Sequence, residues 1–483
     1  MELSKMTFRR KFSVNPYKTL RLPLGEMSLY KDFVNDKRGD HYPVTVRKGE
    51  INEEISNAKY IASSENGGYI SRFLTDFFPI ASYELEICEI SSAKVGFSLE
   101  YNSESALCVM ADGENIEVTC GEEKNTFEYK LTAGDILSIT FRMGAVSVYV
   151  NKGDRPLLVC DNKFDSLRKF SSYDIFTRSH ISLACELGKG GRVVAKNIEA
   201  FLCGGLSHAD MKPMRYEDGT PIIENGRVFL TMSSRLEAQT YQSIISWNPT
   251  LCDFRLEGAM LFDVGDGLCC SDVASSVVHD RNNGKWYIWM CSFSHGHILA
   301  RGELLGDPRF GLQIVDVKLL DTPTGDDLTE FAGFKGDEDP DLCYIDGKWH
   351  LTVCRLEKAD GYHYYHFVSD SPFDGFKYVD RTLTGEKTGG MFTKIDGEYY
   401  FVCGSDFGTR ARYDIYKYND FSKFDKLICD YDDGGFRGWG TVFSVPVGSR
   451  IRHFHITFDR HNASGFNWSY GNIYVYEAYE YLK

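Results

Sequence analysis

The sequence lacks an apolar run long enough to cross a membrane. A spanning helix needs about 20 consecutive apolar residues, and the 483-residue chain contains no such stretch. Met1–Leu22 contains Lys5 and Arg9–Lys11 but lacks the apolar run of about 7 to 15 residues that a signal peptide needs. We therefore expect a cytoplasmic protein that makes no contact with a membrane.

Paired-cysteine motifs are also absent. The 14 cysteines contain no C-x-x-C pattern, and several of them lie inside apolar, strand-like runs. This usage indicates buried thiols in a reducing compartment. We expect free thiols at Cys269, Cys270, Cys343, Cys354 and Cys403.

Positive charge is scarce. The chain has 54 Lys and Arg against 69 Asp and Glu, which gives a net charge of −15, and its densest basic stretch, Arg9–Lys11, is short. Such a charge balance repels a phosphate backbone or an anionic lipid surface. Nucleic acid is therefore not an expected partner.

Helical periodicity is missing over almost the whole chain, whereas short β-branched and aromatic runs recur between Gly, Asn and Asp turns. This pattern predicts an all-β protein. Residues 1–204 are expected to form a β-sandwich, jelly-roll or concanavalin-like, because their strands follow at about ten-residue spacing. The expected strands are Tyr83–Ile90, Val95–Tyr101, Ala106–Ala111, Thr126–Leu131, Ile136–Phe141, Val146–Val150 and Ile181–Cys185.

A repeat begins near residue 206. A turn glycine followed by a polar residue and then an aromatic or apolar strand occurs at Gly226, Gly284, Gly347 and Gly397, with a weaker copy at Gly448. The successive spacings of 58, 63, 50 and 51 residues suit a four-stranded blade with its loops. We therefore predict a five-bladed β-propeller over residues 205–483. The alternative is a second sandwich of unrelated hairpins.

The two parts are expected to have separate cores, because composition changes where the repeat begins. One strand of the first part borrowed to close the ring is compatible with this expectation. The role of the first part is left open between glycan binding, dimerisation and covering the active-site mouth.

Three segments of the repeat resemble a known superfamily. Asp337–Leu342, which runs on to Asp346–Trp349, resembles the acidic blade openings of the five-bladed glycoside hydrolases, which include arabinanases, β-xylosidases, α-L-arabinofuranosidases, invertases and levansucrases. Ser369–Phe376 is similar to their blade-closing turn, with Asp-Gly in place of Gly-Pro, and Gly219–Ile223 is similar to a first-blade opening.

The resemblance implies three carboxylates at one mouth of the propeller: a base or nucleophile, an aspartate that tunes the acid, and a glutamate that protonates the leaving oxygen. Carried over to this sequence, the first is Asp218 and the second is Asp339. Each lies eight residues before its turn glycine, Gly226 or Gly347. Equal offsets predict equal depth on equivalent strands, so we expect both side chains near the axis.

The third carboxylate departs from the pattern. The resemblance places a glutamate near Thr388–Gly389, but the only glutamate nearby is Glu386. Either a longer loop brings Glu386 to the site, or Glu338 is the acid, or the chain performs different chemistry.

Further residues are predicted around these carboxylates. Asp272, Glu338, Trp439, Arg410 and Arg235 are expected to bind substrate; Trp439 lies between two glycines, which mark close approach of a ligand or of backbone.

Two histidine pairs at i, i+2, His295/His297 and His453/His455, each point to one face of a strand. Such a pair can bind a metal or lie in a hydrogen-bonded core. His455 is the predicted metal ligand.

These observations predict hydrolysis of a glycosidic bond in an oligosaccharide, a furanoside or pentoside, by carboxylate acid–base catalysis. No cofactor is required; a structural or catalytic divalent cation and a homo-oligomer are left open. The alternatives are a metal-dependent carbohydrate-modifying enzyme such as a deacetylase, and a non-catalytic sugar-binding protein.

Overall fold

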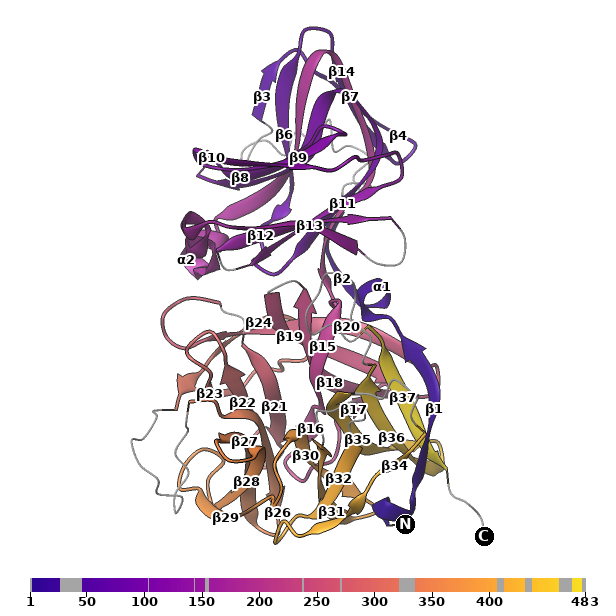
Figure 1. Ribbon diagram of the computed structural model, residues 1–483, viewed down its shortest axis with the longest axis vertical. Helices are drawn as coiled ribbons and strands as arrows, with labels where there is room; N and C mark the ends of the chain where they lie inside the picture. Colours follow the sequence, from indigo (N-terminus) through magenta and orange to yellow (C-terminus); the bar gives the residue numbers. More distant parts are fainter. Residues whose placement is uncertain are drawn as a thin grey trace. The chain divides into compact units, whose positions relative to one another are not determined.

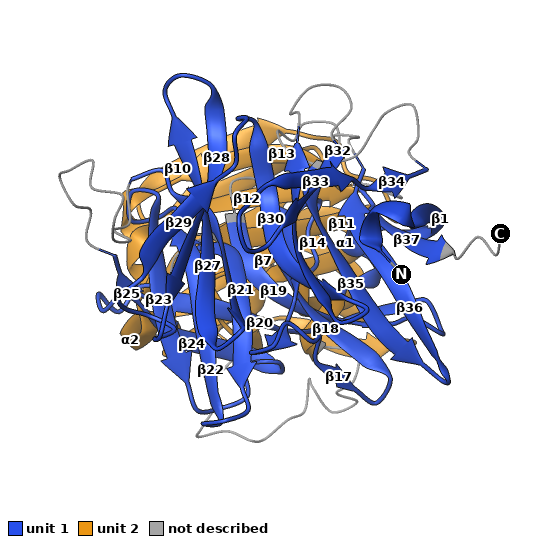
Figure 2. Ribbon diagram, turned by 90° about the horizontal axis from the view of Figure 1, so that it is seen from below, with its two compact units in different colours: residues 1–20, 204–483 blue, residues 21–203 orange. Residues whose placement is uncertain are grey.

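The computed structural model describes residues 2–26, 46–102, 104–142, 144–152, 156–236, 239–269, 272–320, 335–405, 412–430, 437–459 and 471–479. The chain divides into two compact units, one made of Met1–Leu20 and Gly204–Lys483 and the other of Arg21–Cys203 (Figures 1 and 2). We call them unit 1 and unit 2. The fold is almost entirely β, as predicted.

Unit 1 is a five-bladed β-propeller, which confirms the prediction from the glycine repeat. The innermost strands of its five sheets are β15 (Ser207–Pro213), β21 (Val273–Asp280), β26 (Glu338–Ile345), β30 (Lys387–Ile395) and β35 (Arg437–Val447). Each of them contacts the next in this order, and β35 contacts β15, so the ring is closed.

The outer strands complete the blades. Blade 1 adds β17 (Ile223–Glu224), β18 (Arg227–Leu236), β19 (Gln239–Asn248), β20 (Asp253–Asp263) and β24 (Gly311–Asp316); blade 2 adds β16 (Arg215–Tyr216), β22 (Lys285–Ser292), β23 (Ile298–Leu304) and β25 (Lys318–Leu319). Blade 3 adds β27 (Lys348–Glu357), β28 (Gly361–Ser369) and β29 (Lys377–Arg381); blade 4 adds β31 (Glu398–Ser405), β32 (Arg412–Lys417) and β33 (Lys423–Lys426). Blade 5 adds β36 (Arg450–Phe458), β37 (Ile473–Tyr479), β1 (Thr7–Val14) and β34 (Ile428–Cys429).

The repeated glycines occupy the turns that lead into the second strand of each blade. Asp346 and Gly347, between β26 and β27, have φ angles of 50° and 80°. Two consecutive positive φ angles are what a tight two-residue hairpin turn requires. The repeat in the sequence is therefore the repeat of one turn geometry.

The N-terminal residues belong to the propeller, which corrects the predicted boundary of 1–204 for the first part. Strand β1 pairs antiparallel with β37 and parallel with β34. Leu3, Met6 and Phe8 are completely buried in the core between blades 4 and 5. Around β1, the chain forms a short 3-10 helix η1 (Leu3–Lys5) and a helix α1 (Pro16–Thr19). Burial of these three side chains explains why this segment leaves the remainder of the first part.

Unit 2 contains one hydrogen-bonded sheet of 13 strands. Two long strands, β7 (Ser82–Tyr101) and β14 (Ser179–Cys203), pair with each other along most of their length. The other strands are β2 (Arg21–Glu26), β3 (Val46–Gly49), β4 (Asn52–Ser56), β5 (Lys59–Ser64), β6 (Gly68–Asp76), β8 (Glu104–Ala111), β9 (Asn115–Cys120), β10 (Glu123–Glu128), β11 (Ile136–Arg142), β12 (Ala145–Asn151) and β13 (Pro156–Lys163). The unit also has η3 (Asp165–Ser171) and α2 (Tyr173–Phe176). The sandwich stays a prediction.

The buried thiols follow the expectation from the sequence. Cys343, Cys354 and Cys403 are buried free cysteines, and Cys269 is buried, whereas Cys270 lies outside the described residues.

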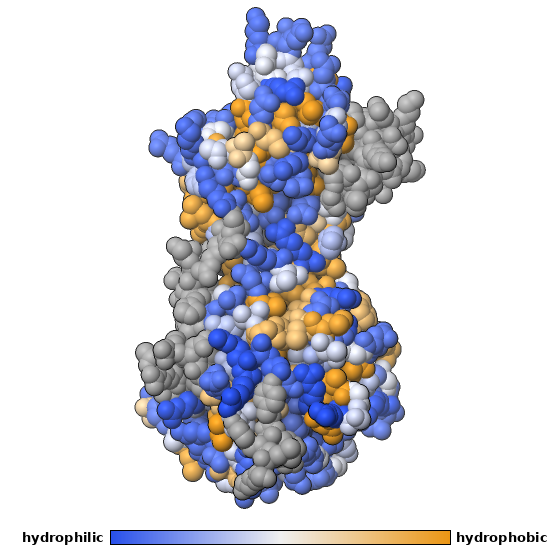
Figure 3. Space-filling view, turned by 90° about the vertical axis from the view of Figure 1, so that its right-hand side faces the viewer, coloured by the Kyte–Doolittle hydropathy of each residue, from blue (hydrophilic) through white to orange (hydrophobic). Residues whose placement is uncertain are grey.

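On the face shown in Figure 3, hydrophilic and apolar residues are interspersed. No described helix is both long and apolar enough to span a bilayer.

Candidate functional site

A β-bulge of one extra residue interrupts the inner strand at the same place in four blades, and the pairing of β35 in blade 5 also shifts, between Arg437 and Thr441. Pairing with the second strand shifts between Ala209 and Lys212, Val273 and Ser276, Glu338 and Asp341, and Thr388 and Met391. The residues within these bulges that have positive φ are Asp210 (53°), Ala274 (60°), Asp339 (50°) and Gly389 (57°). Bulges redirect side chains and are common beside active sites. Two of the four equivalent positions carry an aspartate.

Asp339 lies at the centre of a hydrogen-bond network. Its Oδ2 accepts the Gly389 N–H at 3.0 Å, the Thr388 hydroxyl at 3.3 Å and the Tyr364 hydroxyl at 3.5 Å. The residue is 4% exposed. Thr388 in turn accepts the Trp439 indole N–H at 2.6 Å. The inner strands of blades 3, 4 and 5 thus meet around one carboxylate.

Asp210 is the equivalent aspartate on blade 1. Its Oδ2 accepts the Ser233 hydroxyl at 2.7 Å. Burial and the negative charge of Asp339 raise the pKa of Asp210 to about 7, against the lowering effect of the Arg235 charge. Lys212, two residues further along the same strand, donates to the Pro340 carbonyl at 2.7 Å. Blades 1 and 3 therefore come together across the axis.

Glu338 adds a third carboxyl group beside Asp339. Its Oε2 lies 3.2 Å from His297 Nε2. Burial raises the pKa of Glu338 above its usual value, with the adjacent His297 imidazole acting against it. The His297 ring packs against Phe293 with 4.6 Å between ring centroids.

Asp272 precedes the inner strand of blade 2 and is 1% exposed. It accepts the Ser292 hydroxyl at 3.0 Å and the Ser294 N–H at 3.2 Å. Burial raises the pKa of Asp272, although both of these donors lower it. A cavity of about 350 Å³ is lined by Arg235, Thr240, Val273, Phe293 and Ser294. Asp272 is adjacent to this cavity, because it precedes Val273 in the sequence and accepts a hydrogen bond from Ser294.

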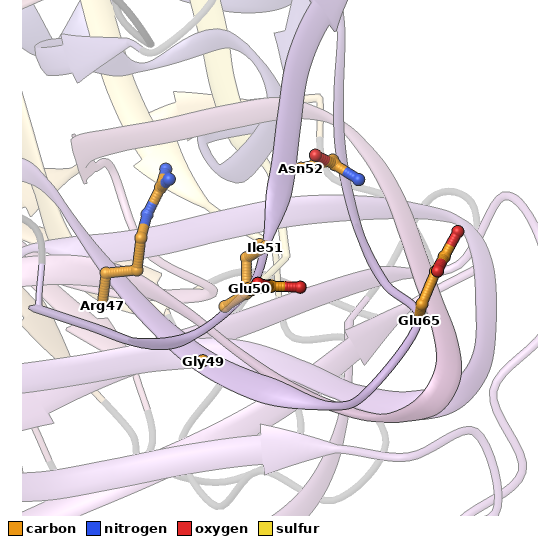
Figure 4. Close-up of a pocket in the computed structure, with 6 residues that line it drawn as sticks. All are labelled: Arg47, Gly49, Glu50, Ile51, Asn52 and Glu65. Carbon is orange, nitrogen blue, oxygen red and sulfur yellow. The ribbon is translucent and has the colours of Figure 1, made fainter.

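A second cavity, of about 520 Å³, lies in unit 2 and is lined by Arg47, Gly49, Glu50, Ile51, Asn52 and Glu65. Figure 4 shows Arg47 turned away from Glu50 and Glu65. Arg47 pairs instead with Glu53. The guanidinium of Arg47 therefore does not converge with the carboxyl groups of Glu50 and Glu65.

No family model matches the chain, and no curated protein does. Glycoside hydrolases are among the solved structures that resemble it. One is a β-1,3-galactosidase of glycoside hydrolase family 43 with galactodeoxynojirimycin (13% identity, 56% of this chain, 94% of that chain, TM-score 0.38). Others are an α-L-arabinofuranosidase from Podospora anserina with cellotriose (11%, 57%, 92%, 0.37) and a family 117 glycoside hydrolase from Zobellia galactanivorans (12%, 57%, 85%, 0.39). Such low identities and TM-scores assign no residue role and no substrate to this chain.

The predicted convergence of Asp218 with Asp339 is wrong. Asp218 accepts the Thr220 N–H in a turn and lies 3.4 Å from Lys394 Nζ and 3.3 Å from Arg281. Lys394 is at the C-terminal end of β30, whereas Asp339 meets Thr388 at the N-terminal end of the same strand. The two aspartates are therefore at opposite ends of the propeller.

Glu386 directly precedes β30, two residues before Thr388. It is exposed, and its carboxyl group approaches Gly361, in the hairpin between β27 and β28. No described hydrogen bond joins it to Asp339. Thr388 occupies the inner-strand position at which the resemblance implied a glutamate.

The remaining predicted residues have mixed outcomes. Trp439 and Arg235 lie at the site, Trp439 through its bond to Thr388 and Arg235 in the cavity wall. Arg410 lies outside the described residues. His455 is completely buried in blade 5, where it bonds to the Thr441 carbonyl at 3.1 Å and packs against Tyr413. It belongs to none of the described groups of potential metal ligands.

Asp210 is a residue of the candidate site that the sequence interpretation missed. One signal was available, because Asp210 follows the predicted domain boundary near residue 204 and so lies on the first strand of the propeller. The turn-based offset pointed past this strand to the loop that contains Asp218.

Proposed function

We propose that unit 1 hydrolyses a glycosidic bond of an oligosaccharide, with Asp210 and Asp339 as its acid–base pair. Such cleavage needs one protonated and one ionised carboxyl group on either side of an oxocarbenium-like centre. When the surroundings of two carboxyl groups give them different pKa values, the group with the higher pKa serves as the acid and the other serves as the base or nucleophile.

The proposal rests on the contrast between Asp210 and Asp339, which occupy equivalent bulge positions in blades 1 and 3. Burial and the Asp339 charge raise the pKa of Asp210 to about 7, so this carboxyl group retains a proton far more readily at neutral pH than an ordinary aspartate does. Asp339 accepts three hydrogen bonds through a single carboxyl oxygen, Oδ2. Asp210 then protonates the leaving oxygen, and Asp339 acts as base or nucleophile. Glu338 is the alternative acid.

The test is turnover of aryl furanosides and pentosides by Asp210→Asn and Asp339→Asn. We expect each variant to lose about 10²- to 10⁴-fold in kcat, the usual contribution of a positioned acid or base. Asp218→Asn is the matched control, because it removes one carboxylate at the other end of the propeller. Full turnover by Asp210→Asn would overturn the assignment. A furanoside or pentoside as the substrate stays a prediction.

A metal-dependent modification such as deacetylation is a second candidate. Ligand atoms of Glu338, Asp339 and Cys354 lie within 4.8 Å of one another. The donors fit a metal poorly, because the Cys354 thiol donates to the Lys387 carbonyl at 3.3 Å and burial holds its pKa well above its usual value, while metals bind the thiolate. Acetate release from an acetylated sugar, measured with and without a chelator, tests this second candidate. A non-catalytic sugar-binding protein would bind these glycosides without turnover.

A further inference from the structure

We infer that the cavity lined by Arg235 binds an anionic group, a carboxylate or a sulfate ester, on a sugar of the substrate. This inference rests on the proposed function, because it names the class of oligosaccharide that the same site takes.

The cavity has the size and lining of a sugar subsite. Its volume of about 350 Å³ is at the small end of the range for small-molecule pockets. Thr240 and Ser294 contribute hydroxyl groups, and Phe293, 40% exposed, contributes an aromatic face. Hydroxyl groups together with an aromatic face suit a ligand that has both polar groups and an apolar ring face.

Of the described residues that line this cavity, only Arg235 is charged. Arg235 is on β18. In the pairing of β18 with the inner strand β15 of blade 1, it lies opposite Ser207. Among the described residues no carboxylate forms an ion pair with it, and its Nε is buried without a hydrogen-bond partner. A buried donor without a partner costs free energy, and a guanidinium matches the two oxygens of a carboxylate or sulfate. An anionic ligand would satisfy it.

The cavity is adjacent to the carboxylates. The Arg235 charge lowers the pKa of both Asp210 and Glu338, and Phe293 packs on His297, the partner of Glu338. If Arg235 served only to neutralise Asp210, a direct ion pair would be expected. Asp210 Oδ2 instead accepts a hydrogen bond from Ser233, which leaves the guanidinium available to a ligand.

The inference is tested by binding rather than by turnover. The probes are D-glucuronate against D-glucose, and D-galacturonate and D-galactose 6-sulfate against D-galactose, titrated into the full chain and followed by ligand-observed NMR. We expect at least one acidic probe to bind about tenfold or more tightly than its neutral counterpart, the gain typical of a charge-assisted hydrogen bond. The uronate and sulfate arms identify which anion is preferred.

Three variants make the test specific. Arg235→Met should abolish the preference, and Arg235→Lys should retain part of it, because lysine keeps the charge but not the fork. Arg255→Met is the control, because it removes an exposed arginine that pairs with Asp253; it should keep the preference.

Absence of binding, equal binding of acidic and neutral probes, or a preference that survives Arg235→Met would each overturn the inference. None of these outcomes depends on hydrolysis. The proposed function would still be judged separately, by the turnover of Asp210→Asn.

Discussion

At the scale of single residues, Asp210 combines two unfavourable features. It has a φ of 53°, in a region that L-residues rarely adopt, although aspartate tolerates it better than most. Its carboxyl group is also buried near the negative charge of Asp339. Strain and unfavourable electrostatics of this kind concentrate at functional sites, where stability is reduced in favour of reactivity.

This combination gives a stability test with a defined sign. The pKa of Asp210 is about 7 in the folded protein and near 3.9 when unfolded. Because the folded value is the higher one, the stabilising contribution is complete below about pH 4 and is lost as the pH rises through about 7. Asp210→Asn should therefore be more stable than wild type at pH 8, by at most roughly 4 kcal/mol, with the difference vanishing towards pH 4.

Thermal melts at pH 4, 6 and 8 measure this effect. Asp218→Asn is the comparison variant, because the pKa of the Asp218 carboxyl group is shifted in the opposite direction. Burial raises the pKa of Asp218, but the Thr220 N–H and the charges of Lys394 and Arg281 outweigh burial and hold it below its usual value. That variant should gain nothing at pH 8. A melting temperature of Asp210→Asn that does not rise relative to wild type between pH 4 and pH 8 contradicts the prediction.

The sequence could identify Asp339 but not its partner. Asp339 is in a run of acids, Asp337–Asp341, that is costly to bury without a purpose. Asp210 is isolated among Ala209, Met211 and Lys212, and nothing local distinguishes it from an ordinary strand residue. Its proposed role depends on the β-bulge and on the proximity of Asp339. Both of these exist only once the strands have paired in the folded protein.

At the scale of strands, the failed offset has a specific cause. In blade 3 the inner strand runs directly into the turn at Gly347, so counting back from the glycine reaches the bulge. In blade 1 the chain makes an excursion between β15 and the turn, during which Arg215–Tyr216 pairs with β21 of blade 2. Counting back eight residues from Gly226 therefore reaches this excursion and not the inner strand. Equal spacing predicts equal depth only where no such excursion intervenes.

A buried ion pair fixes the strand that carries Glu338 and Asp339. Arg355, on β27, bonds to both carboxylate oxygens of Asp337 at 2.8 Å. Asp337 has no exposed surface, and Arg355 is 8% exposed. The pair ties the residue before β26 to the neighbouring strand of the same blade.

Breaking this pair should therefore be costly. Arg355→Met leaves the Asp337 charge buried and uncompensated, which we expect to lower the free energy of unfolding by about 3–5 kcal/mol. The double variant Asp337→Asn/Arg355→Met should recover a large part of this loss, because no charge remains buried. Urea denaturation of the two variants and wild type measures the difference. Equal destabilisation by the single and double variants would show that lost packing, not the unpaired charge, is responsible.

At the scale of the whole molecule, the ring of five blades followed from the sequence because each blade repeats a turn that only a few residue types can form. The closing strand β1 did not follow. Its partner β37 is about 460 residues away, and no local pattern specifies a pairing over such a separation. Burial of Leu3, Met6 and Phe8 decides it.

This topology makes unit 2 an insertion within the propeller sequence. The chain leaves unit 1 at Leu20 and returns at Gly204, and the Gly204 N–H donates to the Leu20 carbonyl at 2.7 Å. Joining these residues through a short glycine linker deletes Arg21–Cys203 without stretching the chain.

We expect the shortened protein to fold with a cooperative thermal transition and to keep the β-rich circular dichroism of a propeller. A truncated chain that starts at Gly204, and so also lacks β1, is the matched comparison; it should be markedly less stable, because β37 loses a paired edge. A shortened protein that fails to fold while the full chain is stable would show that the two units depend on each other.

Closure by β1 also sets an order of events during synthesis. Chains grow at roughly 5–20 residues per second, so β1 leaves the ribosome on the order of 20–90 s before β37 exists. Throughout that interval β1 is a strand without its neighbour, the situation in which strands of different molecules pair and aggregate. Arg9, Arg10 and Lys11 are exposed along it, and we expect these like charges to oppose pairing between nascent copies.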